Sequence, residues 1–83
     1  MRFPISDIMD ERANQDAKWG EQNHDDLYWL GILVEEVGEL SKNIIEKQTA
    51  TVRVKKREEL VQVAAVALVW LECLDRKEAR ENA

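Results

Sequence analysis

Apolar residues recur along this chain at steps of three and four, the spacing of positions that share one face of a helix. The first such segment covers residues 5–19, where Ser6 or Asp7 is placed to cap the helix. A second segment covers residues 27–47, and a third covers about residues 52–77. The stripe of the second segment consists of Leu30, Leu33, Val37, Leu40 and Ile44. The pattern therefore predicts an all-α protein.

A polar segment, residues 20–26, separates the first two predicted helices. It begins with Gly and reads GEQNHDD, which is typical of a connecting loop. Asp25 or Asp26 is placed to cap the helix that follows.

A shorter turn, residues 47–51, separates the second and third predicted helices, with Thr49 or Thr51 as candidate caps. So short a link predicts an antiparallel helical hairpin. The last six residues, EARENA, are expected to form a frayed tail. Residues 1–83 are thus expected to form a single domain, a hairpin with an N-terminal helix.

The third predicted helix is apolar in every direction over residues 60–71, where Gln62 is the only polar side chain. A helix that is apolar all round has to be buried all round. Two other helices in a chain of 83 residues are too few to cover it. We therefore expect a second copy of the chain to supply the remaining cover, in an obligate homo-oligomer.

Composition restricts the partners and the compartment. The net charge of −5 argues against a nucleic acid polymer as the partner, because phosphate neutralisation needs a basic surface. Residues 60–71 are too short to span a bilayer, and the N-terminus lacks the apolar run of a signal peptide. The single cysteine, Cys73, cannot form an intrachain disulfide. These features predict a soluble, cytoplasmic protein with no membrane partner.

Three glutamates, Glu35, Glu36 and Glu39, lie within five positions of the second predicted helix and are surrounded by apolar residues. At helical spacing they are direct neighbours, and Trp29 and Ile32 fall in or beside the same sector of the helix. Partial burial strengthens the repulsion among their charges, so a bound cation would stabilise the cluster.

In an antiparallel hairpin, Glu59 and Gln62 of the third helix can face this cluster. The combined set offers only oxygen donors, which suits Mg²⁺ or Mn²⁺ rather than zinc or copper. Such an ion can bridge a polyphosphate and activate a water nucleophile. The alternative from spacing alone is a solvated acidic face, with Lys42, Lys47 and residues 53–57 as counter-ions.

The motifs EEVGE (35–39) and ELVQ (59–62), with 19 residues between them, resemble the EExxE and ExxD motifs of the MazG-like all-α nucleoside triphosphate pyrophosphohydrolases. The segment KWGEQNH (18–24) is similar to the Trp, Gln and His segment that precedes this helix in several members. The resemblance covers about residues 5–76, nearly the whole chain.

This resemblance implies a function and a set of site residues. The implied reaction is Mg²⁺-dependent hydrolysis of (deoxy)nucleoside triphosphates at the α–β phosphoanhydride, giving a nucleoside monophosphate and pyrophosphate, as in nucleotide-pool housecleaning. The implied metal ligands are Glu36, Glu39 and Glu59, with Glu35 as ligand or base. Glu35 and Glu39 are the candidate catalytic residues. The implied nucleobase contacts are Trp19, Gln22 and His24. Members of the family form dimers or tetramers with four-helix-bundle cores.

One position departs from the family pattern, because Gln62 stands where the family usually has Asp. An amide oxygen can ligate a cation but brings no charge, so the departure weakens electrostatic binding of Mg²⁺. The alternative function is therefore a non-catalytic helical module that binds nucleotides or proteins. From the residues alone, Trp19 fits either a stacking platform for a base or a cover for one end of the bundle.

Overall fold

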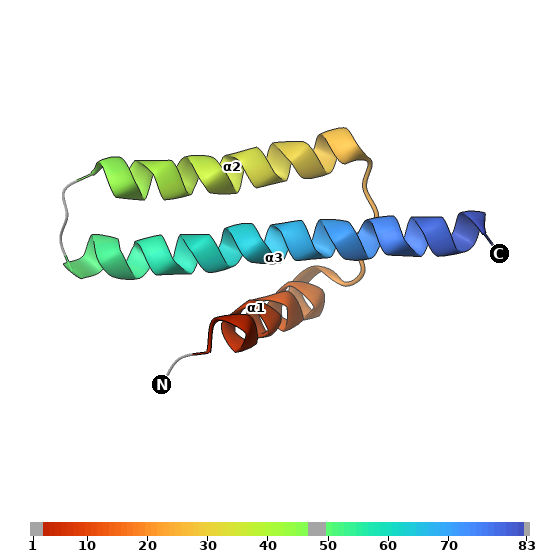
Figure 1. Cartoon of the computed structure of the whole chain (residues 1–83), viewed down its shortest axis with the longest axis horizontal. Helices are drawn as coiled ribbons and strands as arrows, with labels where there is room; N and C mark the ends of the chain where they lie inside the picture. The colour runs from red at the N-terminus through yellow and green to blue at the C-terminus, as the bar shows by residue number, and fades with distance from the viewer. Residues whose placement is uncertain (1–2, 47–49, 83) are drawn as a thin grey trace.

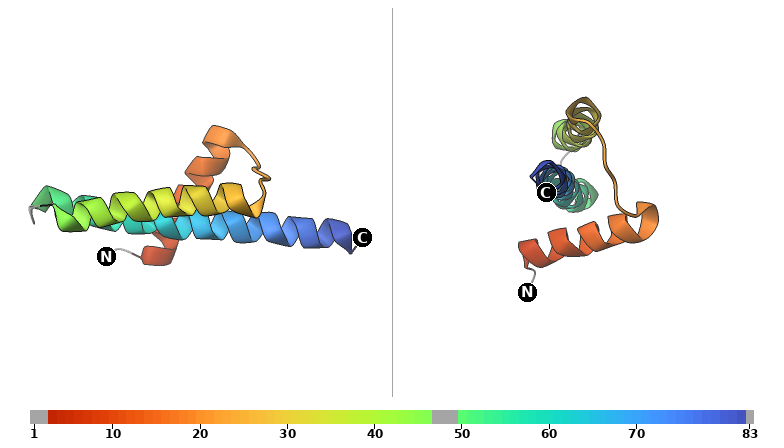
Figure 2. Two further views of the ribbon diagram at one scale, coloured as in Figure 1. Left: turned by 90° about the horizontal axis from the view of Figure 1, so that it is seen from above. Right: turned by 90° about the vertical axis from the view of Figure 1, so that its right-hand side faces the viewer.

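Helix α3 lies between the other two helices in the computed structural model, which describes residues 3–46 and 50–82 (Figure 1). α1 spans Pro4–Trp19, α2 spans Asp26–Ile45 and α3 spans Ala50–Glu81. α2 and α3 form an antiparallel hairpin, and α1 crosses α3 steeply (Figure 2, left). The described residues contain no strand, so the predicted all-α class and the predicted hairpin are confirmed.

Helix α1 begins one residue earlier than predicted and without a side-chain cap. Pro4 occupies its first turn, and the residue before it, Phe3, makes no capping hydrogen bond. Proline suits this position because its missing N–H has no partner at a helix start. Ser6 and Asp7 lie inside the first turn, so the prediction that either caps α1 is wrong. At the other end, Gly20 has φ of 69°, a left-handed conformation that glycine adopts without steric cost.

Helix α2 begins as the sequence predicts. The Asp25 carboxylate accepts a hydrogen bond from the Tyr28 backbone N–H at 2.9 Å, which confirms Asp25 as the cap. Asp26 is already the first helical residue. The helix ends at Ile45, and Lys47, the predicted end, lies outside the described residues.

Helix α3 is longer than predicted at both ends. It begins at Ala50, so Thr51 lies within the helix and is not its cap, while Thr49 lies outside the described residues. It continues past Lys77 to Glu81, so the prediction of a frayed tail is wrong. The added residues are mainly Glu, Ala and Arg, which favour helix. In the described part of the chain, no helix is long and apolar enough to cross a membrane.

A small apolar core forms where α2 packs on the C-terminal half of α3. Trp29 is its largest member, with 2% of its surface exposed, and it packs with Val69 and Cys73. Ile32 and Trp70 cover this group from its edge. The core therefore lies next to the start of α2 and the loop that precedes it.

Helix α1 packs against α3, and in the described part of the chain it does not pack against α2. Its buried residues are Arg12 and Gln15. Most of the apolar residues of α1 are exposed, namely Ile5, Met9, Ala13 and Ala17.

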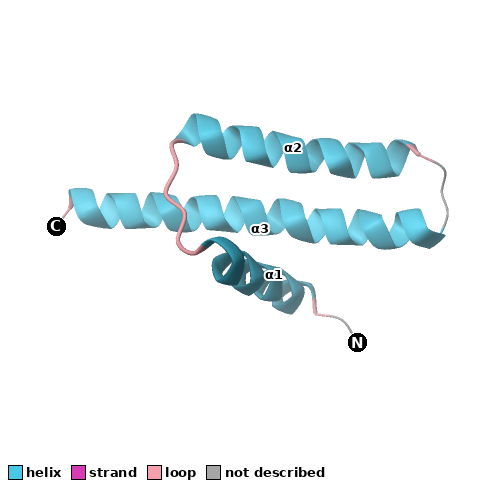
Figure 3. Cartoon of the chain, turned by 180° about the vertical axis from the view of Figure 1, so that it is seen from behind, coloured by secondary structure: helices cyan, strands magenta, loops and turns pink. Residues whose placement is uncertain are grey.

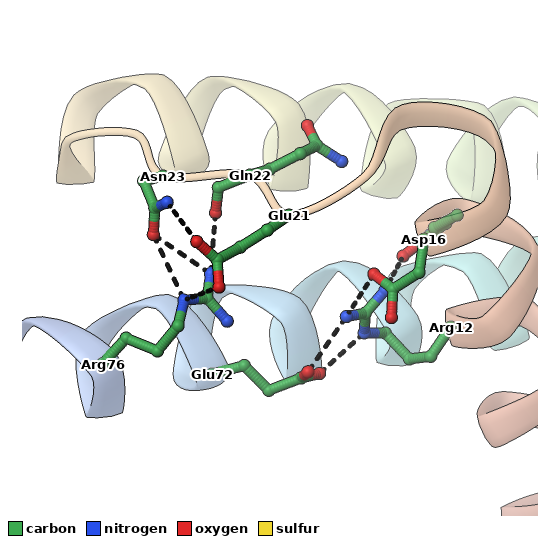
Figure 4. Close-up of polar contacts among 8 residues, drawn as sticks. Arg12, Asp16, Glu21, Gln22, Asn23, Glu72 and Arg76 are labelled. Carbon is green, nitrogen blue, oxygen red and sulfur yellow. Dashed lines mark hydrogen bonds and ion pairs between the residues drawn. The ribbon is translucent and has the colours of Figure 1, made fainter.

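An ion-paired arginine joins α1 to α3. The Arg12 guanidinium donates to both carboxylate oxygens of Glu72, at 2.7 and 3.0 Å (Figure 4). It also donates to Asp16 at 3.0 Å and to the Gln15 side chain at 3.2 Å. Hydrogen bonds to Glu72 and Asp16 outweigh the effect of burial and raise the pKa of Arg12. A forked pair of this kind is strong and fixes the geometry of the contact between α1 and α3.

Two apolar stripes on the hairpin are exposed. The stripe on α2 consists of Leu27, Leu30, Val34 and Val37. The stripe on α3 consists of Leu60, Leu71 and Leu74. The apolar residues predicted to form a single stripe on α2 therefore do not share one environment. Leu33 and Leu40 are partly buried, while Leu30 and Val37 are exposed.

Candidate functional site

A cleft of about 780 Å³ lies where the end of α1, the loop 20–25, α2 and α3 meet. Seen from behind, this loop passes across α3 on its way from α1 to α2 (Figure 3). The cleft brings together residues from both predicted sets, namely Trp19, Gln22, His24, Glu36 and Gln62. The remaining predicted residues, Glu35, Glu39 and Glu59, are not among those that line it.

One end of the cleft is aromatic. The His24 ring stacks on Tyr28, with centroids 4.0 Å apart, and meets the edge of Trp29 at 4.9 Å. His24 Nε2 lies 3.2 Å from the Gln22 side-chain oxygen, within hydrogen-bond distance. Trp19 is 57% exposed, and the Lys18 ammonium lies 4.6 Å from its ring centre. This end therefore offers flat aromatic surface beside an amide group.

The other end of the cleft is acidic. Glu36 is half-buried, and burial raises its pKa above the ordinary value. The Glu59 carboxyl raises it further, both by charge repulsion and by accepting a hydrogen bond from protonated Glu36. The charges of Glu35 and Glu39 act in the same direction. The hairpin thus brings Glu59 next to Glu36, as its antiparallel direction predicts.

The donors at this end fit a hard divalent cation in their chemistry. Glu36 and Gln62 line the cleft, Glu59 adjoins Glu36, and all three offer oxygen atoms. The repulsion that raises the pKa of Glu36 is the interaction that a cation would remove. Among the described residues, no three His, Cys, Asp or Glu side chains converge on a common point that would hold a metal ion. The metal site therefore stays a prediction.

Several residues around the cleft were missed by sequence reasoning. Tyr28 became a candidate only once the Asp25 cap placed it in the first turn of α2, beneath His24. Arg12 holds α1 on α3 through Glu72, and Arg76 holds the loop on α3 through Gln22. These partners lie 60 and 54 residues apart in sequence. No local pattern pairs residues across such a separation.

We found no match to the chain among models of protein families, among curated proteins or among solved structures.

Proposed function

We propose that this chain is a Mg²⁺-dependent pyrophosphohydrolase of (deoxy)nucleoside triphosphates. The main support for this proposal is that a single cleft has aromatic side chains at one end and acidic side chains at the other. A nucleoside triphosphate has the matching two parts, a flat base and a charged phosphate chain. The cleft volume, about 780 Å³, lies in the usual range for small-molecule sites.

The aromatic end supports recognition of the base. Trp19 and Tyr28 are both exposed and line the cleft, so each has ring surface on which a base can stack. The Gln22 side chain contacts His24 and presents an amide, which can hydrogen-bond to the edge of a base. We propose that the base is contacted by Trp19, Gln22 and His24, and also by Tyr28.

The acidic end supports phosphate chemistry. In the proposal, Mg²⁺ would be held by Glu36, Glu39, Glu59 and Gln62, with Glu35 as a further ligand or as the base. When bound, the ion would neutralise phosphate charge and polarise the phosphorus–oxygen bonds. Water oxygen attacks the α-phosphorus, and the bond to the bridging oxygen breaks. Pyrophosphate leaves with the electron pair, and Glu35 accepts the proton of the attacking water.

A matched pair of adjacent glutamates on α3 tests the proposal. Glu59 adjoins Glu36, whereas Glu58 is exposed. Glu59→Gln is expected to reduce Mg²⁺-dependent pyrophosphate release about hundredfold or more, because it removes a charge from the metal site. Glu58→Gln is expected to stay within about twofold of wild type. Pyrophosphate would be measured for each (deoxy)nucleoside triphosphate, and no release by concentrated wild-type protein would favour the non-catalytic binding module.

Restoring the family acid tests the role of Gln62, which lines the cleft near the glutamates. Gln62→Asp adds a charged oxygen ligand, so we expect half-maximal activity at a Mg²⁺ concentration about tenfold lower. The same change should lower the melting temperature of the metal-free protein, because it adds repulsion. Unchanged Mg²⁺ dependence would place residue 62 outside the metal site. Titrating Mg²⁺ in the pyrophosphate assay measures the effect.

We also propose that the enzyme is a homo-oligomer assembled through the two exposed stripes as a four-helix bundle. Each stripe lies roughly a third of a turn around its helix from the residues that face the other helix of the hairpin. Since α2 and α3 are antiparallel, both stripes lie on the same side of the hairpin. This side is opposite the one on which Glu36 and the cleft lie. The side with the stripes is free of the loop that joins α1 to α2 (Figure 2, right). Exposed apolar residues gathered on one side of a helical hairpin are typical of an interface.

Placing a charge in this face tests the assembly. Val34 is 60% exposed in the middle of the α2 stripe. Val34→Glu is expected to shift the protein to monomer at concentrations where wild type is a dimer or tetramer, because a buried unpaired charge opposes association. Ala13→Glu adds the same charge to the exposed side of α1 and should leave assembly unchanged. Sedimentation velocity over a range of concentrations measures both, and a wild-type monomer throughout would contradict the proposal.

A further inference from the structure

The loop 20–25 carries the candidate base-binding residues Gln22 and His24. It is not helical, so no regular backbone hydrogen bonds fix its middle residues. Its ends are fixed by the α1 terminus, where the Gly20 N–H donates to Asp16 at 2.8 Å, and by the Asp25 cap. Between these ends, the loop bonds to side chains of α3. The position of the candidate base site therefore depends on α3.

Arg76 makes the most extensive of these contacts. Its Nη2 donates to the backbone oxygen of Gln22 at 2.9 Å, and its Nε and Nη2 donate to the Asn23 side-chain oxygen at 3.2 Å. It also forms an ion pair with Glu21 at 3.3 Å. Figure 4 shows that the Gln22 side chain points away from Arg76 while its backbone oxygen faces the guanidinium. Arg76 thus holds the backbone and leaves the amide side chain free to face the cleft.

Two further residues on the same side of α3 contact the loop and its junction with α2. The Cys73 thiol donates to the backbone oxygen of His24 at 3.6 Å, and Trp70 Nε1 donates to Asp26 at 3.0 Å. Trp70, Cys73 and Arg76 are spaced by three residues, so they lie along one side of the helix. They contact the chain at residues 26, 24 and 22, in reverse order. The loop is therefore held at successive points along α3.

We propose that Arg76 is a positioning residue for nucleotide binding, which sets the place of Gln22 and His24 relative to the acidic end. This inference rests on the proposed function. Gln62 and Arg76 lie on the same helix, 14 residues apart, or about 21 Å at 1.5 Å per residue. One rigid helix thus carries part of the acidic end and also holds the loop of the aromatic end. Loosening the loop alters where the base sits and leaves the acidic end in place.

Arg76→Gln tests this inference against two controls. Its side chain is 28% exposed, so we expect the variant to fold, which circular dichroism would check. Arg80→Gln makes the same substitution at an exposed position one turn further along α3. Lys77→Gln removes the same charge from an exposed neighbour. Both controls should behave like wild type.

The first readout is the nuclear magnetic resonance spectrum of the free protein. His24 is the only histidine in the chain, so its ring protons give unique signals. The ring stacks on Tyr28 at 4.0 Å, which shifts those signals from random-coil positions. Arg76→Gln is expected to move them toward random-coil values, whereas both controls keep them in place. Wild-type signals in Arg76→Gln would overturn the inference.

The second readout is the kinetics of nucleotide hydrolysis. Arg76→Gln is expected to raise KM about tenfold, because the loop loses the hydrogen bonds that position the base-binding residues. The kcat is expected to stay within about twofold of wild type. A fall in kcat with unchanged KM would overturn the positioning role. If the wild-type protein hydrolyses no nucleotide, the proposed function fails, and the His24 signals then still decide whether Arg76 fixes the loop.

Discussion

Replacing Glu36 with Gln is expected to reduce pyrophosphohydrolase activity about hundredfold or more and to stabilise the metal-free protein. Glu36 lines the cleft and adjoins Glu59, so the proposed Mg²⁺ loses a charged ligand. In the free protein, the Glu36 charge is half-buried and is repelled by Glu59, Glu35 and Glu39. A neutral amide of the same size removes that repulsion.

The stabilisation should depend on pH in a defined direction. Burial and the neighbouring acids raise the pKa of Glu36 above 4.5, its ordinary value, so the folded protein binds this proton more tightly than the unfolded chain. Glu36 therefore costs no stability below about pH 4.5, and its cost grows as pH rises through the raised pKa. The stabilisation by Glu36→Gln should therefore be complete at pH values above the raised pKa of Glu36 and absent below about pH 4.5.

Thermal unfolding of both proteins from pH 4 to pH 8 measures this difference. Glu46→Gln is the control, because Glu46 is exposed beyond the end of α2. Adding Mg²⁺ should raise the melting temperature of wild type and of Glu46→Gln, and leave Glu36→Gln unchanged. An equal Mg²⁺ response in all three proteins would exclude Glu36 from the metal site.

Replacing Arg12 with Met is expected to lower the free energy of unfolding by about 2–3 kcal/mol. Arg12 is 4% exposed, and its loss removes the forked pair with Glu72 and leaves the buried Gln15 side chain without that donor. The Glu72 side chain is 40% exposed and regains water, which keeps the loss below that of a fully buried pair. For a domain of this size, such a loss is a large fraction of the total stability.

Urea unfolding followed by circular dichroism measures this effect. Arg80→Met is the control, because Arg80 is exposed in the last turn of α3. Replacing Arg12 and Glu72 together with Met should restore part of the lost stability, since the partly buried Glu72 charge is then not left without its partner and Asp16, whose side chain is 56% exposed, is solvated by water. A change below about 0.5 kcal/mol in Arg12→Met would show that the pair does not hold α1 on α3.

Local patterns were enough to predict the helices and the hairpin. Helical periodicity identified all three helices, and the Asp25 cap followed from a short acidic side chain at a helix start. The proximity of Glu59 to Glu36 also followed, because an antiparallel hairpin with a short turn restricts which positions face each other. Each of these inferences depends on residues close in sequence or on one simple geometric constraint.

The tertiary structure decided which faces are buried and where the loop lies. The buried residues of α1 are Arg12 and Gln15, and Arg12 pairs with Glu72 of α3, 60 residues away in sequence. Likewise, Arg76 fixes the loop through Gln22 and Asn23. Charged side chains have many possible partners along a chain, and only the packed arrangement of helices selects one. The sequence by itself therefore determined the helices and their order, while long-range ion pairs and hydrogen bonds decided how those helices enclose the cleft.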